Sequence, residues 1–265
     1  MTEQARVLID RDGAVAHVRL NRPEKRNGLD LPMFEQLIAA GRSLAEDKSV
    51  RCVVLSGEGP AFCAGLDFKS IMMADQAATE KLLEREGVAN MAQRIAWVWQ
   101  ELPVPVIAAV HGSTFGGGLQ IALGCDMRYV HPDAQLSVME IKWGLIPDMS
   151  ITKTLPPLVG LDVAKELTFT GRRVSGQEAL ALGLATRVCD DPVGAALETA
   201  QLIASKSPEA IRAGKQLFNR APQLPVRAAF ELETELQLPL LRSPNQLEAI
   251  RANMMKQTPN FKDPE

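Results

Sequence analysis

The sequence predicts an α/β protein with an all-helical C-terminal region, on two observations. Over the first 190 of its 265 residues, short apolar runs bounded by turn-forming residues alternate with amphipathic helical patterns. This alternation is typical of a largely parallel sheet covered by helices. From residue 191 the strand patterns stop and only helical patterns follow. We therefore expect a core over residues 1–190 and a helical region for oligomerisation over residues 191–265.

Each strand is predicted from a short apolar run. These runs occupy residues 7–9, 15–20, 52–57, 106–110 and 127–130. The first two flank a turn-forming stretch and predict a hairpin. His17 alternates with apolar neighbours on the second strand, so we expect it to lie on that strand's polar face.

The helices are predicted from apolar residues at helical spacing and from capping residues. Asp30 is expected to cap a helix that has Pro32 in its first turn, and a short apolar helix is expected over residues 119–123. One long helical pattern covers residues 75–99. The C-terminal patterns lie at residues 195–204, 209–218, 228–238 and 245–255. These last helices fit either a cover on the core or subunit contacts.

Composition and charge exclude several classes of protein. Lys and Arg number 29 and Asp and Glu 32, a net charge of −3, which argues against binding to nucleic acid or to anionic membranes. No apolar stretch approaches the roughly 20 residues that span a bilayer, and the N-terminus lacks the pattern of a signal peptide. The four cysteines are far apart and the three histidines lack metal-ligand spacing. We expect a cytoplasmic protein without disulfides and without a metal site.

A run of three glycines, Gly116 to Gly118, is the main candidate for chemistry. It follows a buried strand and precedes an apolar helix. Without Cβ atoms a ligand can approach the backbone, and a helix N-terminus presents N–H groups that bind an anion or a developing oxyanion. The alternative is a turn packed closely against the sheet. The run matches neither a dinucleotide-binding nor a P-loop motif.

Two further segments carry candidate side chains. In residues 61–68, Gly65 permits an unusual turn, Asp67 can cap a following helix, and Cys63 is expected to be a buried packing residue. In residues 139–148, Glu140 and Asp148 are carboxylates in a mostly apolar stretch. Burial raises a carboxyl pKa and suits it to proton transfer; the alternative is a solvated loop.

Taken together, these segments resemble the crotonase superfamily of enoyl-CoA hydratases and isomerases. The resemblance runs in order from about residue 5 to residue 190. The matching stretches are Asn21-Arg22-Pro23, Ala61 to Asp67, Pro105 to Gly112, Gly116 to Gly118, Cys125-Asp126, Ala134 to Leu136, Gly144 to Pro147, Leu167 to Gly171 and Ala179 to Ala185.

The resemblance implies a spiral of repeated strand-strand-helix units and a C-terminal helical region used in trimer assembly. It implies a homotrimer or homohexamer and a coenzyme A thioester as substrate, with no other cofactor. The family's oxyanion hole, two backbone N–H groups, maps onto Leu66 and Gly117. The residues around it map onto a substrate- and CoA-binding set of Ala64, Gly65, Asp67, Gly116 and Gly118.

The resemblance also implies which side chains move protons. Family hydratases use two glutamates; the second maps onto Glu140, whereas Gln120 stands at the first position. A glutamine amide orients water but cannot exchange a proton, so double-bond isomerisation is favoured over hydration. Asp148, eight residues after Glu140, resembles the dienoyl-CoA isomerase pattern. The alternatives are a dienoyl-CoA isomerase using Glu140 and Asp148, another acyl-CoA reaction, or a non-catalytic CoA-thioester-binding homologue. We expect helix 75–99 to wall the acyl pocket with Met91, Ile95 and Trp99.

Overall fold

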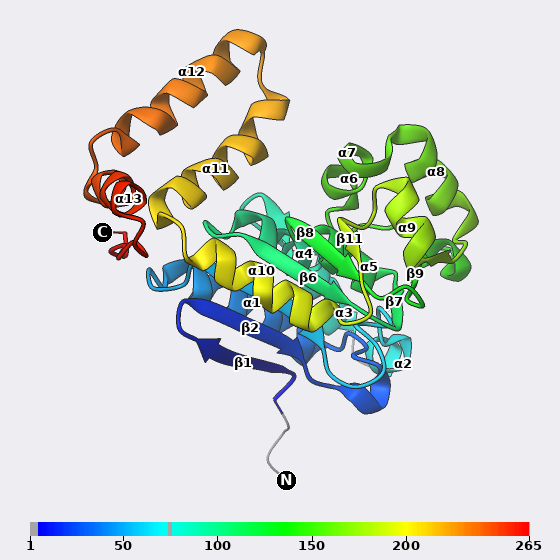
Figure 1. Cartoon of the computed structure of the whole chain (residues 1–265). Coiled ribbons are helices and arrows are strands. Elements are labelled where there is room, and N and C mark those ends of the chain that lie inside the picture. The colour runs from blue at the N-terminus through cyan, green and yellow to red at the C-terminus, as the bar shows by residue number, and fades with distance from the viewer. Residues whose placement is uncertain (1–4, 74–75, 265) are drawn as a thin grey trace.

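The computed structural model describes residues 5–73 and 76–264, and its centre is a six-stranded sheet (Figure 1). The strand order is β1-β2-β3-β6-β8-β11. Only β1 runs antiparallel to its neighbour; the other pairs are parallel. The strands are β1 Val7–Asp12, β2 Val15–Leu20, β3 Cys52–Gly57, β6 Val106–Val110, β8 Met127–Val130 and β11 Arg187–Val188. The predicted hairpin and the buried strands are therefore confirmed.

Both faces of this sheet are covered, which explains why its central strands are apolar at nearly every position. Helices α1 (Leu31–Glu46) and α4 (Met91–Glu101) contribute to the hydrophobic cluster on one face. Helix α10 (Pro192–Ala204) covers the other (Figure 1). Alanines at every fourth position, Ala196, Ala200 and Ala204, are buried there and form one flat helix face. The Asp30 side chain caps α1 by accepting from the Met33 N–H at 3.0 Å, as predicted.

A smaller sheet beside the large one shows the spiral path of the chain. Its strands β10 (Val174–Ser175), β9 (Gln135–Ser137) and β7 (Ser113–Phe115) lie in that order. Cys63 extends it by a parallel bridge to Thr114. After each of β3, β6 and β8 in the large sheet, the next segment therefore joins the small one. This alternation of two strand layers with helices agrees with the predicted spiral.

The single helix predicted over residues 75–99 is wrong. Asp75 lies outside the described residues. From Gln76 the chain forms α3 (Gln76–Leu83), a hairpin of β4 (Arg85–Glu86) and β5 (Ala89–Asn90), and then α4. Gly87 has φ +71°, a left-handed conformation that suits the turn between β4 and β5. Asn90 then caps α4, with reciprocal bonds between the Asn90 and Gln93 side chains and backbone.

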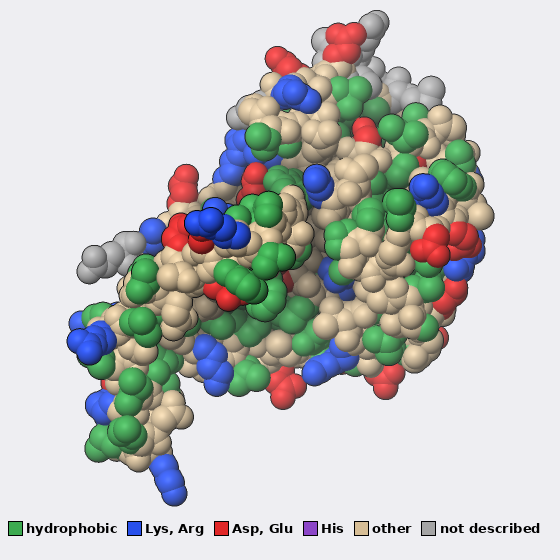
Figure 2. Space-filling model, turned by 90° about the horizontal axis from the view of Figure 1, so that it is seen from above, with side chains coloured by type: hydrophobic (Ala, Val, Ile, Leu, Met, Phe, Trp, Pro, Cys, Tyr) green, Lys and Arg blue, Asp and Glu red, His purple; other side chains and the backbone are tan. Residues whose placement is uncertain are grey.

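The C-terminal helices divide into one that completes the core and three that extend beyond it (Figure 1). Because α10 packs on the large sheet, the core extends past the predicted boundary at residue 190. The extended helices are α11 Pro208–Arg220, α12 Val226–Gln237 and α13 Pro244–Met255. They carry exposed apolar side chains, among them Phe218, Val226, Phe230, Leu247 and Met254. Figure 2 shows hydrophobic side chains gathered over this part of the surface.

The remaining helices are short. They are α2 Phe68–Met73, α5 Gly117–Leu123, α6 Ile151–Thr154, α7 Pro156–Val159, α8 Leu161–Thr170 and α9 Gly176–Leu182. Across residues 5–73 and 76–264, none of the helices has both the length and the apolar character needed to cross a membrane.

Candidate active site

The predicted site residues lie at one edge of the small sheet. The segment through Cys63 and strands β7 and β9 run side by side and parallel. Leu66 follows Cys63 by three residues, Gly117 follows the end of β7 by two, and Glu140 follows the end of β9 by three. The carboxyl ends of parallel strands meet at the same edge, where ligands of open α/β sheets bind. Three separate stretches of sequence are thus brought to one place.

A cavity of about 300 Å³ opens at this edge. Residues 64–66 and 115–117 form part of its wall, and Glu140 and Asp148 are the two carboxylates among its described lining residues. The other lining residues are apolar: Phe34, Phe68, Ile71, Leu82, Leu83, Ala92, Met139, Trp143, Leu145, Ile146 and Met149. The rings of Phe68 and Trp143 lie 4.3 Å apart, centroid to centroid. An apolar acyl group with one polar end fits such a lining.

The wall predicted from Met91, Ile95 and Trp99 is wrong. None of these three residues lines the cavity, and Ile95 and Trp99 are fully buried in the core. Because the chain breaks into two helices, the cavity instead receives Leu82 and Leu83 from α3 and Ala92 from α4. The apolar residues Ile95 and Trp99, whose helical spacing indicated a helix, therefore lie on the face of α4 that packs into the core.

Leu66 presents a backbone N–H group to the cavity edge. The Gly65 carbonyl accepts a hydrogen bond from the Leu29 N–H at 2.9 Å. Because a trans peptide directs its C=O and N–H to opposite sides, the Leu66 N–H points away from Leu29. In the described part of the chain this N–H has no acceptor.

Gly117 presents a second such group. The Gly116 carbonyl accepts from the Gln120 N–H at 3.0 Å in the first turn of α5, so the Gly117 N–H points out of the helix N-terminus. It too lacks an acceptor within the described residues. A Cβ at Gly65, which has φ +89°, would lie 3.6 Å from the Gly117 nitrogen and 2.6 Å from the Phe115 carbonyl oxygen. The absence of that Cβ lets the two donor peptides lie close together.

Gln120 holds the Glu140 carboxylate in a fixed orientation. The Gln120 side chain is 1 % exposed. Its Oε1 accepts from the Met149 N–H at 2.8 Å, and its Nε2 donates to Glu140 Oε1 at 2.6 Å. Since a backbone N–H can only donate, the amide cannot be reversed. The other carboxylate oxygen, Glu140 Oε2, is buried without a partner among the described residues. One oxygen is thus anchored and the other remains available.

Both carboxylates have raised pKa values. Burial is the main cause of the raised pKa of Glu140, and the nearby Asp148 charge adds to it, whereas the Gln120 hydrogen bond opposes it. Partial burial also raises the pKa of Asp148. Groups that hold and release a proton nearer neutral pH are suited to general acid–base chemistry.

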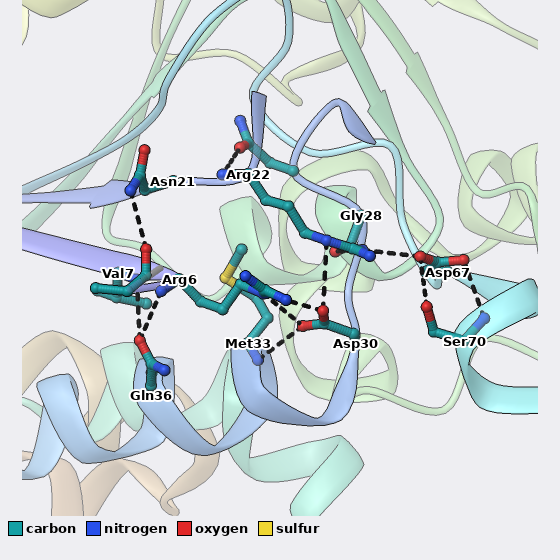
Figure 3. A network of polar contacts seen from close by, with 12 residues as sticks. Arg6, Val7, Asn21, Arg22, Gly28, Asp30, Met33, Gln36, Asp67 and Ser70 are labelled. Atoms are coloured by element: carbon teal, nitrogen blue, oxygen red, sulfur yellow. Dashed lines mark hydrogen bonds and ion pairs between the residues drawn. The ribbon is translucent and has the colours of Figure 1, made fainter. Parts of the chain in front are cut away.

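Two members of the predicted substrate- and CoA-binding set do not line the cavity. Asp67 pairs with Arg22 and accepts from Ser70, capping α2 (Figure 3). Partial burial alone would raise the pKa of Asp67, but the bonds from Ser70 and Arg22 lower it to about 2. A Cβ at Gly118 would lie 2.2 Å from the Cys63 carbonyl oxygen, so Gly118 permits tight packing. Ala64, Gly65 and Gly116 do line the cavity.

Other candidate side chains lie away from this chemistry. Burial raises the pKa of the Cys63 thiol to about 12, which agrees with a packing role. His17 contacts Ser56 Oγ at 2.8 Å from the large sheet. Across the described ranges, no group of three or more His, Cys, Asp or Glu side chains is arranged to hold a metal ion. Sequence reasoning missed the Met149 N–H, because a backbone donor leaves no residue-type signal.

Comparisons with known proteins agree with this geometry. A family model described as enoyl-CoA hydratase/isomerase matches residues 10–264. The chain is 32 % identical over 261 residues to the peroxisomal Delta(3,5)-Delta(2,4)-dienoyl-CoA isomerase of Arabidopsis thaliana, covering 94 % of this chain and 93 % of that protein. It is 33 % identical over 268 residues to the mitochondrial enoyl-CoA hydratase domain-containing protein 2 of Homo sapiens, covering 97 % and 89 %.

A solved structure gives the same result for the fold. The crystal structure of enoyl-CoA hydratase from Bacillus anthracis has a TM-score of 0.91 to this chain at 31 % identity, covering 97 % of this chain and 99 % of that one. With two free N–H groups and an oriented carboxylate around an apolar cavity, these matches show that the chain is an enzyme of the enoyl-CoA hydratase/isomerase family, in the crotonase superfamily.

Proposed function

We propose that the protein isomerises a carbon–carbon double bond in the acyl chain of a coenzyme A thioester, with Glu140 as the principal proton-transfer group. The observation that carries this proposal is the locked Gln120 amide. Both of its ends are engaged, by the Met149 N–H and by Glu140. The position where a hydratase of the family would have its first acid therefore holds a group that neither gives nor takes a proton.

The chemistry follows from the arrangement of donors and base. The thioester oxygen would accept from the Leu66 and Gly117 N–H groups, and Glu140 Oε2 would remove a proton from C2. The resulting dienolate carries its negative charge on that oxygen, where each donor typically stabilises the transition state by about 3–4 kcal/mol. Return of the proton to C4 converts a 3-enoyl thioester into a 2-enoyl thioester. No atom is gained or lost.

A specific observation favours a second candidate, isomerisation of a 3,5-dienoyl to a 2,4-dienoyl thioester. Asp148 lines the same cavity as Glu140 and raises its pKa. Two acids would allow one to remove a proton at C2 and the other to deliver one at C6. The relative from Arabidopsis thaliana carries that activity in its name.

The lining defines the class of acyl group. Apart from Glu140 and Asp148, every side chain that the described residues contribute to the cavity is apolar, so an uncharged hydrocarbon chain is the expected occupant. Coenzyme A takes part only as a component of the thioester substrate, and we propose that no separate cofactor is needed. We further propose a homotrimer or homohexamer, because assembly would cover the exposed apolar residues of α11–α13. We also propose that the protein acts in the cytoplasm.

The test is turnover of purified protein on three thioesters: a 3-enoyl-CoA, a 3,5-dienoyl-CoA and a 2-enoyl-CoA. We expect isomerisation of at least one of the first two and little hydration of the third. Glu140→Gln should remove isomerisation, and Asp148→Asn should remove only the dienoyl reaction. Glu101→Gln, an exposed carboxylate outside the cavity, is the control.

Two results would contradict the proposal. Rapid hydration by the native protein that Asp148→Asn abolishes would identify a hydratase in which Asp148 replaces the missing glutamate. Tight thioester binding without turnover on any of the three substrates would identify a non-catalytic binding protein.

A further inference from the structure

A buried network of charges lies beside the turn that carries Leu66 (Figure 3). Arg6 and Arg22 both approach the Asp30 carboxylate, at 3.0 and 3.4 Å, and Arg22 donates to Asp67 Oδ2 at 2.8 Å. Arg22 is 8 % exposed and Asp30 is 6 % exposed. Removing charged groups from water is costly. A charged network that is largely removed from water is therefore expected to have a specific role in the structure.

Two carboxylates of the network, Asp30 and Asp67, directly follow Leu29 and Leu66, whose backbone contact orients the Leu66 N–H. Leu29 donates its N–H to the Gly65 carbonyl at 2.9 Å and accepts from the Asp67 N–H at 3.0 Å. These two bonds fix the peptide planes before and after Leu66. The first of them sends the Leu66 N–H to the side opposite Leu29.

Arg22 bridges the two segments that form this contact by binding the residue before Leu29 and the residue after Leu66. One of its terminal nitrogens, Nη1, donates to the Gly28 carbonyl at 3.0 Å and to the Asp67 carboxylate at 2.8 Å. Gly28 precedes Leu29, and Asp67 follows Leu66. A planar guanidinium holds its donors in fixed directions, so this bridge sets the spacing and register of the two segments.

We propose that Arg22 and Asp67 are positioning residues that hold the Leu66 N–H in line with the thioester oxygen. Neither residue lines the cavity. Their effect on this N–H is transmitted through the backbone contact between Leu29 and residues 65–67. The inference rests on the proposed function, since it assigns a task to an N–H group that the reaction would use.

The first variant is Asp67→Asn, which is nearly isosteric. Asparagine keeps an oxygen for the Ser70 N–H, so the cap of α2 is retained, but it loses the charge that binds Arg22. Asp126→Asn is a matched control. Asp126 is ion-paired to Lys215 at 2.8 Å, accepts from the Val106 N–H, and is similarly shielded, yet it lies outside the cavity. A second variant, Arg22→Lys, keeps the charge but loses the planar fork.

Two readouts separate positioning from simple stabilisation. Turnover is measured at a temperature where circular dichroism shows each variant fully folded. Because a poorly aligned donor loses part of its effect on the transition state, Asp67→Asn should lower kcat about tenfold with KM within about threefold, whereas Asp126→Asn should keep kcat within about twofold. The second readout is the infrared C=O stretch of a bound saturated acyl-CoA. The native protein should shift this band to lower frequency, and Asp67→Asn and Arg22→Lys should each reduce the shift.

The outcomes distinguish this inference from the proposed function. A native protein that shifts the band, with Asp67→Asn showing the same shift and kcat, would overturn the positioning role alone. A native protein that binds the thioester without any shift would overturn the oxyanion site itself, and the positioning role with it. Equal loss of kcat in Asp67→Asn and Asp126→Asn would indicate a general structural effect and would also overturn the assignment.

Discussion

Gln120→Glu tests how the locked amide shapes the site. The glutamine Nε2 lies 2.6 Å from Glu140 Oε1, and its Oε1 accepts from the Met149 N–H. A carboxylate introduced at position 120 keeps the acceptor for Met149 but replaces the donor with an oxygen. The variant therefore places two carboxylates within hydrogen-bonding distance of each other, and they must share a proton.

The size of the effect follows from that distance. Two such charges, with centres about 4 Å apart, repel by about 4 kcal/mol at an effective dielectric constant of about 20. The pair therefore retains one proton at pH values well above those at which a single carboxyl group ordinarily loses its proton. A pKa raised in the folded state gives stability that is present at low pH and is lost as the pH rises. We thus expect the free energy of unfolding of Gln120→Glu to fall below that of the native protein by up to about 4 kcal/mol between about pH 4 and pH 8.

The assay has two parts. Urea unfolding curves for both proteins across this pH range give the difference in free energy of unfolding. Hydration of a 2-enoyl-CoA, followed by loss of the absorbance of the conjugated enoyl thioester, should increase in the variant because the shared proton supplies the second acid–base group. Gln36→Glu is the control: Gln36 Oε1 also accepts a backbone N–H, from Arg6 at 2.7 Å, but its side chain lies away from Glu140.

Two results would refute this reasoning. Parallel stability curves for Gln120→Glu and the native protein would show that the side chains at positions 120 and 140 are not in hydrogen-bonding contact. A pH-dependent loss of stability without any gain in hydration would leave the geometry intact and show that water has no productive place beside position 120.

Three further predictions concern single residues. Glu140→Gln should lower turnover by about 10²–10⁴-fold. Because burial raises the pKa of Glu140, the free energy of unfolding of this variant relative to that of the native protein should increase as the pH rises above 4.5. Unfolding curves measure this difference, and a decrease with rising pH would contradict the burial of the Glu140 carboxyl. Leu66→Pro removes one N–H donor and should lower kcat about 10²–10³-fold, whereas Leu66→Met keeps it; full activity of a folded Leu66→Pro would end the oxyanion assignment. Gly118→Ala places a Cβ against the Cys63 carbonyl and should cost about 1–3 kcal/mol of unfolding free energy, and an unchanged melting temperature would show that the turn yields.

Local sequence patterns were sufficient for the fold class and for most elements. The strands at residues 52–57, 106–110 and 127–130 are apolar because both faces of the large sheet are covered, and this signal is contained within a few neighbouring residues. The cap at Asp30 and the glycine-rich start of α5 are local in the same sense. The helix prediction failed over residues 76–99 because a helical period persisted across a hairpin that turns at Gly87.

The same distinction between local sequence patterns and long-range contacts applies to the site. The sequence by itself singled out the three segments that carry Leu66, Gly117 and Glu140, and the resemblance to a family supplied their expected roles. Only the tertiary structure decided what surrounds them. Gln120 is locked by an N–H 29 residues further along the chain, and Asp67 is held by an arginine 45 residues earlier. Contacts between residues so far apart in the sequence depend on how the spiral packs its successive turns. Hydrophobic periods and capping residues report only on near neighbours, so they do not predict these contacts.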